Sequence, residues 1–509
     1  MLYLLPLLAP AFLLAAAIVA ARGPGPRPAR SLRIANGAAI GALVVALASL
    51  GVLIGSGQGE SPLGLARLDA VSAPMLLLVA FLGVVVLRFS ATYLDGEARQ
   101  GAFTAWFCGT LAAALLLVQA GHLVTLALGW IGAGIGLHRL LLFYPERPGA
   151  RRAARKTALV TRAGDTALVG AALLLAVAAG SGEIGAILAA ARAGESPGLM
   201  AAAAALLGIA ALLKSAQLPA HGWLTEVMET PTPVSALLHA GLINAGGFLL
   251  IRFADVMLAA PGVLAALALI GGLTALFAGL VMLTQPAVKT ALAWSTIAQM
   301  GFMILQCGLA LFPLALLHIL AHSLYKAHAF LGAGRAVEKV AAIGRPGPVA
   351  VPDLSAVGRA FLVALGLYAA IGAGFGILGK SPQALALGAI LVFGVAYLFA
   401  QGFADAAPQR LTRRLSLLAV CATLGYFGLQ AAADALTTPL LPAPPPPGAL
   451  EWVVMAMAVF GFGLTAFAQA TFPLWAQHPA AAGLRVHLSN GLYLNALTDR
   501  LLGGWKRAA

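Results

Sequence analysis

Charged residues are rare in this chain of 509 residues. They make up 9% of the sequence, whereas hydrophobic residues make up 61%. Apolar runs of about 20 residues, enough to cross a bilayer, recur from end to end and leave no room for a separate soluble catalytic domain. The composition therefore predicts an all-α polytopic membrane protein, a helix bundle of about 14 or 15 transmembrane helices.

Cysteine is scarce as well. The three cysteines, Cys108, Cys307 and Cys421, lie far apart inside apolar runs, where they behave as small hydrophobic residues. This spacing excludes a disulfide framework and a CxxC metal site. The segment Gly132-Ala-Gly-Ile-Gly136 has GxGxG spacing and no strand before it, so close helix packing is favoured over a dinucleotide loop. We expect no cofactor in this chain.

Acidic residues, 17 in number, are outnumbered by 31 basic ones, which gives a net charge of +14. The predicted spans cover residues 2–21, 35–55, 70–94, 102–119, 122–144, 158–180, 198–229 (broken), 233–255, 261–284, 288–306, 311–334, 360–378, 383–404, 415–433 and 450–471. The odd-numbered loops and the tail contain 21 of the basic residues, and the even-numbered loops, counted with Arg252 near the end of the preceding span, contain four. The positive-inside rule therefore puts the N-terminus outside and the tail in the cytoplasm.

The chain divides into four predicted segments. Residues 1–100 form N-terminal transmembrane helices, 101–340 a core that contains the candidate proton-translocating residues described below, 341–471 C-terminal transmembrane helices, and 472–509 a cytoplasmic or interfacial tail. The first run, 2–21, is too long for a signal-peptide core, so we expect it to be the first helix. Aromatic and basic residues alternate with apolar ones in the tail, which could form an amphipathic helix at the membrane surface.

Lys214 interrupts the end of an apolar run and is followed by Ser215-Ala-Gln-Leu-Pro219. A lysine at bilayer depth costs about 2.5–3.5 kcal/mol, so a buried lysine beside a helix break suggests an ion pathway. The alternative is that the helix ends at an interface, where Lys214 would extend into water.

A second polar group follows further along the chain. His318, His322 and Lys326 recur every four residues, so each lies about 40° around the helix from the previous one and the three form one stripe. Such a stripe suits proton transfer, because imidazole titrates near neutral pH and a desolvated lysine can be shifted toward that range. Metal binding is the competing interpretation, but no HExxH glutamate or third ligand lies nearby. His328 is off the stripe and has either a contact role or a structural one.

The segment between Pro219 and His239 contains the other candidate groups. Pro231 and Pro233 cannot continue a helical hydrogen-bond ladder, and a broken membrane helix needs protein or water to cover its backbone, which predicts a hydrated cavity. Glu226 and Glu229 could pair with Lys214 or accept its proton, or they could simply be interfacial.

The candidate set also includes three residues that lie before Lys214 in the sequence. Arg162 and Asp165 are three apart on a predicted helix and are expected to pair. For His138, near the end of its span, a structural role is at least as well supported as a relay role.

These residues carry a resemblance to a known family. The stretches Lys214-Ser-Ala-Gln-Leu-Pro219, Pro231-Thr-Pro-Val-Ser-Ala-Leu-Leu-His239-Ala, Val288–Phe302 and His318–Ala327 are similar to the antiporter-type subunits of respiratory complex I and of multisubunit sodium/proton antiporters. Thr161-Arg-Ala-Gly-Asp165 matches an earlier signature of that family. The resemblance covers roughly residues 70–335, with a weaker echo at 490–500. It implies an antiporter-like bundle with discontinuous helices.

One departure from the family is important. Antiporter-type subunits have a glutamate in a Trp-Glu-Gly context, where this chain has Trp130-Ile131-Gly132. The form of the motifs at His239–Arg252, Leu137–Phe143 and Met303–Gly308 most resembles DabB, the membrane subunit of the DAB inorganic-carbon accumulation complex. That resemblance implies a bacterial inner-membrane subunit, not catalytic alone, that works with a DabA partner related to carbonic anhydrases. Zinc is then expected in the partner subunit.

The resemblance implies that protons, or sodium, pass through this chain to drive CO2 hydration and bicarbonate accumulation by the partner. The groups expected to carry the ion are Lys214, Glu226, His239, His318, His322 and Lys326. Two alternatives stay open: a subunit of complex I or of a multisubunit cation/proton antiporter, and a passive membrane anchor for a cytoplasmic enzyme. Buried lysines argue against the anchor, because a passive anchor would gain nothing from the free-energy cost of inserting them into the membrane.

Overall fold

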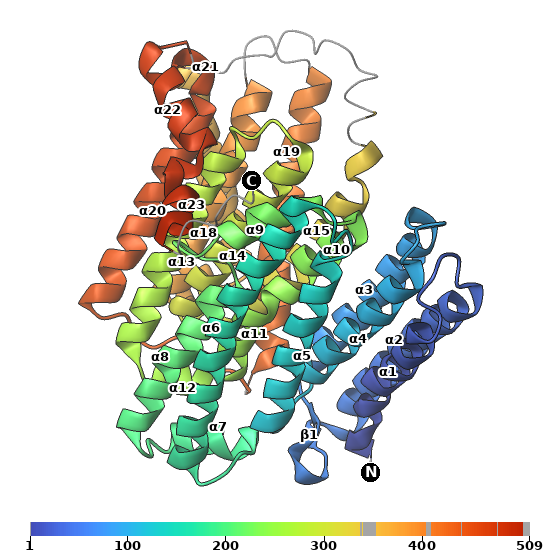
Figure 1. Cartoon of the computed structure of the whole chain (residues 1–509). Helices are drawn as coiled ribbons and strands as arrows, with labels where there is room; N and C mark the ends of the chain where they lie inside the picture. The colour runs from blue at the N-terminus through green and yellow to red at the C-terminus, as the bar shows by residue number, and fades with distance from the viewer. Residues whose placement is uncertain are drawn as a thin grey trace.

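The computed structural model describes residues 2–335, 338, 353–403, 409–438, 440–475 and 477–501. Within them, 15 helical segments are long and apolar enough to cross a bilayer. Most run along a common direction and form one elongated bundle (Figure 1). The predicted all-α polytopic membrane fold is confirmed. Residues 502–509 of the predicted tail and the first residues of the predicted segment 341–471 lie outside the described residues.

The N-terminal part is a four-span unit at one side of the bundle (Figure 1). Its elements are η1 (Leu2–Leu7), α1 (Leu8–Ala21), α2 (Ala29–Ser56), α3 (Ser72–Tyr93) and α4 (Gln100–Val118). Between α2 and α3 a short hairpin pairs β1 (Gly59–Glu60) antiparallel with β2 (Arg67–Leu68), around η2 (Pro62–Gly64). The hairpin lies at the same end of the bundle as the N-terminus.

The central part contains the two interrupted spans. Its elements are α5 (Leu123–Leu141), α6 (Pro148–Ala179), α7 (Ile184–Arg192), α8 (Pro197–Lys214), α9 (Gly222–Glu226), η3 (Val227–Glu229), α10 (Thr232–Ala240), η4 (Leu242–Asn244), α11 (Ala245–Arg252), α12 (Ala254–Leu258), α13 (Pro261–Met282), α14 (Val288–Gly308) and α15 (Phe312–Leu331). The break after Lys214 was predicted. The second discontinuity, at Gly241 between α10 and η4, was not.

The C-terminal part adds four spans and the tail. Its elements are α17 (Leu354–Gly374), η5 (Ile377–Gly379), α18 (Pro382–Phe403), α19 (Gln409–Thr437), α20 (Ala449–Ala470), α21 (Phe472–Trp475), α22 (Pro479–Ser489), η6 (Gly491–Tyr493) and α23 (Leu494–Leu501). In Figure 1, α21 and α22 lie at the end of the bundle opposite to the N-terminus, as an odd number of spans requires. The predicted orientation relative to the cytoplasm stays a prediction.

Small residues allow close approach where helices of the core cross. A Cβ at Gly301 of α14 would lie 2.6 Å from the backbone nitrogen of Ala275 in α13. On α5, a Cβ at Gly136 would overlap the Thr110 hydroxyl of α4. Because lipid tails are as apolar as the side chains, the hydrophobic effect does not drive helices together in a membrane, and close van der Waals packing contributes much of the free energy of helix association. The helix-packing interpretation of Gly132–Gly136 is therefore confirmed.

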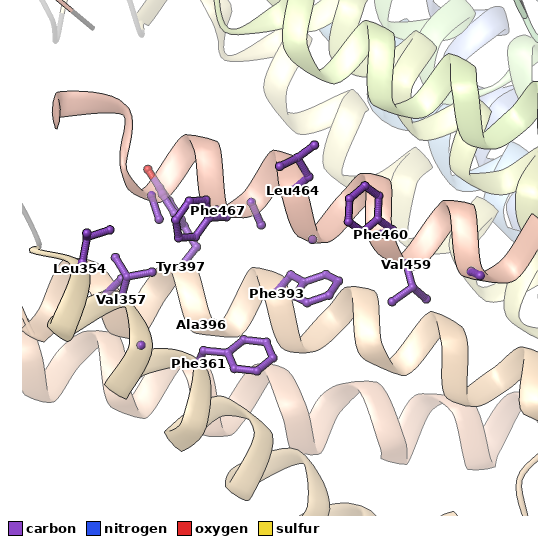
Figure 2. Close-up of a pocket in the computed structure, with 16 residues that line it drawn as sticks. Leu354, Val357, Phe361, Phe393, Ala396, Tyr397, Val459, Phe460, Leu464 and Phe467 are labelled. Atoms are coloured by element: carbon purple, nitrogen blue, oxygen red, sulfur yellow. The ribbon is translucent and has the colours of Figure 1, made fainter. Parts of the chain in front are cut away.

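An apolar groove of about 870 Å³ lies between α17, α18 and α20 (Figure 2). Phe361, Phe393, Tyr397, Phe460 and Phe467 are among its lining residues. Figure 2 shows these rings around the groove, and none of the predicted site residues lines it. The hydrated cavity expected at the helix break is not this groove and stays a prediction.

Candidate functional site

Lys214 ends α8, and the chain then leaves the helix through a left-handed residue. Ala216 has φ +50°, and the Gln217 N–H donates to the Leu212 carbonyl at 3.1 Å. This is the Schellman arrangement, in which an otherwise free carbonyl of the last helical turn gains a donor. A side chain of α13 satisfies one more backbone group of the break: the Leu218 N–H donates to Thr274 Oγ1 at 3.2 Å. Protein groups thus bond both of these backbone groups, as an apolar surrounding demands.

The Lys214 side chain is 5% exposed, so it does not extend into water. Its Nζ lies 4.5 Å from the centroid of the Trp130 ring on α5, a cation–π contact. On the edge of the same indole, Nε1 of Trp130 donates to Asp165 Oδ1 on α6 at 2.8 Å. Asp165 is the carboxylate that acts electrostatically on Lys214. Among the described residues, no carboxylate lies within 4.0 Å of Lys214 Nζ, so Lys214 and Asp165 contact the face and the edge of one indole without forming an ion pair.

Lys326 of α15 is fully buried, and its Nζ donates to the Leu292 carbonyl of α14 at 3.1 Å. The Thr296 hydroxyl donates to the same carbonyl at 2.9 Å. His239 Nδ1 lies 3.1 Å from Thr296 Oγ1. Because the Thr296 proton is directed at Leu292, we assign the proton of His239 to Nδ1. His239 Nε2 is then a buried acceptor, and it has no hydrogen-bond partner among the described residues.

The histidines continue this polar chain along α15. His322 Nε2 lies 3.2 Å from the His239 carbonyl, which assigns its proton to Nε2. The rings of His322 and His318 have centroids 5.9 Å apart, and His318 is half-buried. His318, His322 and Lys326 therefore share one face of α15, as their spacing predicts. The described residues contain no group of three or more His, Cys, Asp or Glu that could hold a metal ion.

Hydrogen bonds through the second helix break connect the two lysine regions. The Ser215 hydroxyl, next to Lys214, donates to the Ile243 carbonyl in η4 at 3.0 Å. Next to Ile243, Asn244 Nδ2 donates to Ser323 Oγ, three residues before Lys326, at 2.9 Å. The interruption at Gly241 thus lies between the two buried lysines and contacts the helix of each.

The glutamates after the break have other partners than expected. Pairing with Lys214 was one of the roles considered for Glu226, but its Oε1 accepts from the buried Lys156 at 2.7 Å and its Oε2 lies 3.5 Å from Arg152 Nε. Glu229 is 3.8 Å from Arg147, with both side chains about half exposed. Neither glutamate lies beside Lys214, because the chain turns at the break and α9 packs on the first turns of α6.

The predicted pairing of Arg162 with Asp165 is also wrong. Asp165 accepts a hydrogen bond from Trp130, whereas Arg162 is exposed, and the ion pairs of the described residues do not include these two. Residues three apart lie only about 60° apart around a helix, so the spacing allows the pair, but Asp165 accepts the indole N–H that the neighbouring α5 offers. His138 Nδ1 contacts the Ala154 carbonyl of α6 at 3.2 Å, a bundle contact. His328 is exposed, away from the polar chain.

Several site residues were missed from the sequence: Trp130, Lys156, Asn244, Thr296, Ser323, Asn495 and Asp499. Lys156 resembled one more basic residue of a cytoplasmic loop, and its burial depends on partners up to 343 residues away. For Thr296, the neighbouring motif Trp294-Ser-Thr296 was the available signal.

Comparisons with known proteins agree with this architecture. Residues 120–344 match the family described as NADH:quinone oxidoreductase/Mrp antiporter, TM. "Probable inorganic carbon transporter subunit DabB2" of Halothiobacillus neapolitanus is 36% identical over 520 residues, which cover 98% of this chain and 93% of that protein. NADH-quinone oxidoreductase subunit L of Escherichia coli is 36% identical over 274 residues, 53% of this chain and 44% of that protein.

A similar solved structure is the Mrp complex from Dietzia sp. DQ12-45-1b. The match has a TM-score of 0.64 and 24% sequence identity, and it covers 98% of this chain and 59% of that chain. At this identity the match shows a shared fold.

Proposed function

Because the chain belongs to the DabB family of inorganic carbon transporter subunits, we propose that it is the energy-coupling subunit of a complex in a bacterial inner membrane. It passes protons, with sodium as the alternative ion, down their gradient. This flow energises a DabA-type partner that holds zinc and hydrates CO2, so that bicarbonate accumulates in the cytoplasm. The chain is not catalytic alone.

The single observation that carries this proposal is the pair of buried lysines without an ion-paired carboxylate. Lys214 and Lys326 are 5% and 0% exposed, and within the described part of the chain no acidic group lies within 4.0 Å of either ammonium. A buried cation costs several kcal/mol when it lacks a close counter-charge. Groups of this kind change their charge readily, which suits an ion pathway better than an anchor.

The hydrogen-bond geometry suggests how the groups divide the work. Lys214 and Lys326 switch charge, and His239, His318 and His322 relay protons between Lys326 and the outside of the bundle. The free Nε2 of His239 is a proton acceptor in the fully buried part of this path. A charge on one lysine disfavours a charge on the other, because little water screens them. Glu226, paired with Lys156, is the carboxylate at the end of the path beyond the break.

The test is bicarbonate accumulation in a carbonic-anhydrase-deficient bacterium that requires high CO2. The chain is expressed with and without the adjacent large gene, as wild type and as Lys214→Ala, Lys326→Ala and the control Lys380→Ala. Lys380 forms a partly exposed pair with Asp434 at 3.3 Å, so its loss removes a lysine without touching the path. We expect uncoupler-sensitive growth in air only with both proteins and only in the wild type and the control.

Other outcomes select the alternatives. Rescue that a sodium ionophore abolishes and a protonophore spares would assign sodium as the ion. Equal rescue by both path variants would favour the passive anchor. No rescue from an assembled pair would favour a complex I or antiporter subunit, for which Ile131 in place of glutamate is the opposing observation.

A further inference from the structure

The tail helix α23 provides most of the acceptors for one buried ammonium. Lys156 of α6 is 1% exposed, and its Nζ donates to Glu226 Oε1 at 2.7 Å, Asn495 Oδ1 at 2.6 Å and Asp499 Oδ1 at 2.8 Å. An ammonium has three donors, so all three are used. Asn495 Nδ2 also donates to Glu226 Oε1 at 3.3 Å. Lys156 therefore joins α6, α9 and α23 in one network.

The tail also packs directly against the segment beyond the helix break. Gly222, the first residue of α9, has no room for a Cβ, because that atom would overlap the Asn495 side chain. The part of the tail just before α23 makes similar contacts. The Ser489 carbonyl accepts from Gln285 Nε2 at 3.2 Å, and a Cβ at Gly491 would lie 3.3 Å from the Trp294 ring. The tail thus covers α9 and the start of α14, the helix that contacts Lys326.

This network cannot be an ordinary surface ion pair. Exposed pairs contribute little, but removing one partner of a buried pair leaves an uncompensated charge. A helix of eight residues does not hold its conformation alone, so α23 depends on these contacts. In turn, α9 has only five helical residues, and its two ends contact Asn495 and, through Glu226, Lys156.

We propose that α23 braces the second half of the broken helix, with Lys156, Asn495 and Asp499 as positioning residues. They hold α9 in place relative to Lys214 and touch no transported ion themselves. The position of the tail thereby determines the geometry of the break. Any partner contact that displaces the tail reaches the ion path through this brace.

The first measurement is hydrogen–deuterium exchange of residues 215–226 in the full chain in lipid nanodiscs. We compare Asp499→Asn, Asp499→Glu and Lys156→Met with the control Asp95→Asn, which removes an exposed pair with Arg27 at 3.3 Å. We expect exchange to rise by at least about tenfold in Asp499→Asn and Lys156→Met and to stay at the wild-type rate in Asp499→Glu and the control. Wild-type exchange in Asp499→Asn would overturn the proposal.

A second measurement distinguishes loss of the brace from a wider loss of structure in Asp499→Asn. Gly222→Cys with Asn495→Cys puts two thiols at the point of contact, where oxidation is expected to link α9 to α23. In the Asp499→Asn background, oxidation should return exchange of 215–226 to within about twofold of the wild type, and reduction should reverse this. Failure of the link to restore protection would overturn the brace.

Activity provides a separate readout, and this readout alone rests on the proposed function. Bicarbonate accumulation should be lost in Asp499→Asn and regained in Asp499→Glu and in the oxidised double-cysteine variant. If exchange behaves as expected but wild type and Lys214→Ala accumulate bicarbonate equally, the proposed function fails and the brace stands. If accumulation depends on Lys214 but no tail variant changes exchange or accumulation, the brace fails and the function stands.

Discussion

The indole of Trp130 donates its Nε1 proton to Asp165 at 2.8 Å. The face of the same ring contacts the Lys214 ammonium, with 4.5 Å between Nζ and the ring centroid. Lysine and carboxylate therefore contact the face and the edge of one indole and do not form a direct ion pair. This arrangement lies one residue before Ile131, where related antiporter-type subunits have a glutamate.

Trp130→Phe tests the hydrogen bond while it keeps the ring over Lys214. A hydrogen bond to a charged group contributes about 1.5–3 kcal/mol, so we expect a lower melting temperature and reduced bicarbonate accumulation from an assembled complex. The control is Trp106→Phe, since Trp106 is 40% exposed. Unchanged accumulation in Trp130→Phe would show that the ring alone suffices.

The carboxylate of Asp165 is expected to replace the missing glutamate. Asp165→Asn should abolish coupled accumulation, and adding Ile131→Glu to this variant should restore part of it, because a carboxylate then returns to the Lys214 region. Asp255→Asn is the control, because Asp255 pairs with Arg192 at 2.7 Å, away from this lysine. Uptake in membrane vesicles, measured per assembled complex, distinguishes the variants. Full activity in Asp165→Asn would contradict the assignment.

Thr296→Val removes the acceptor of the His239 Nδ1 proton. An unsatisfied buried donor costs about 1–3 kcal/mol, and His239 would also lose the bond that fixes its tautomer. We expect slower coupled uptake and a lower melting temperature. Thr423→Val is the matched control: Thr423 is buried, and its hydroxyl donates to the Ala419 carbonyl of its own helix at 2.9 Å. Equal losses in both variants would indicate a general packing effect.

Ala216 is a non-glycine residue in the left-handed region at the break, with φ +50°. The left-handed conformation costs an L-residue roughly 1–2 kcal/mol, which glycine avoids. Ala216→Gly should therefore raise the melting temperature or leave it unchanged, whereas Ala216→Val should lower it. Thermal unfolding of the purified chain in detergent checks both directions. Ala310→Gly tests the same effect where α14 ends, because Ala310 has φ +57°.

Asp69, in the loop before α3, should show the clearest pH dependence. Burial raises its pKa, but the Arg252 and Arg67 guanidinium groups and the Ser72 N–H lower it, and the net pKa lies well below the usual range. Because the folded-state pKa is depressed, this stabilisation is present above the unfolded value of about 3.9 and is lost as pH falls further. Stability near pH 7 should not vary through this group.

Asp69→Asn should remove that stabilisation at every pH. It leaves Arg252, whose side chain is 2% exposed, without its carboxylate, a change that typically costs about 3–5 kcal/mol. Thermal unfolding at pH 7 and at pH 3.5 measures both effects. The difference from the wild type should shrink at the lower pH, and a constant difference would show that Asp69 does not titrate in this range.

Much of the fold was predictable because the signals are local. The apolar runs gave the spans, and Lys214 followed by Pro219, Pro231 and Pro233 gave the first break, since a buried charge and a missing N–H are visible in the sequence. The second break, at Gly241, has no proline. This break depends on hydrogen bonds with two serines from other parts of the chain. Ser215 donates to the Ile243 carbonyl, and Ser323 accepts from Asn244.

The sequence by itself determined that this is a bundle of membrane spans with lysines and histidines within apolar runs, because hydropathy and helical spacing act within one segment. Only the tertiary structure decided the partners. Glu226 meets Lys156 across 70 residues, and Asp499 meets it across 343. Asp165 faces Trp130 rather than Arg162 because helix rotation in a packed bundle follows the contacts with neighbouring helices. Those contacts depend on shape and charge far along the chain, which no local pattern contains.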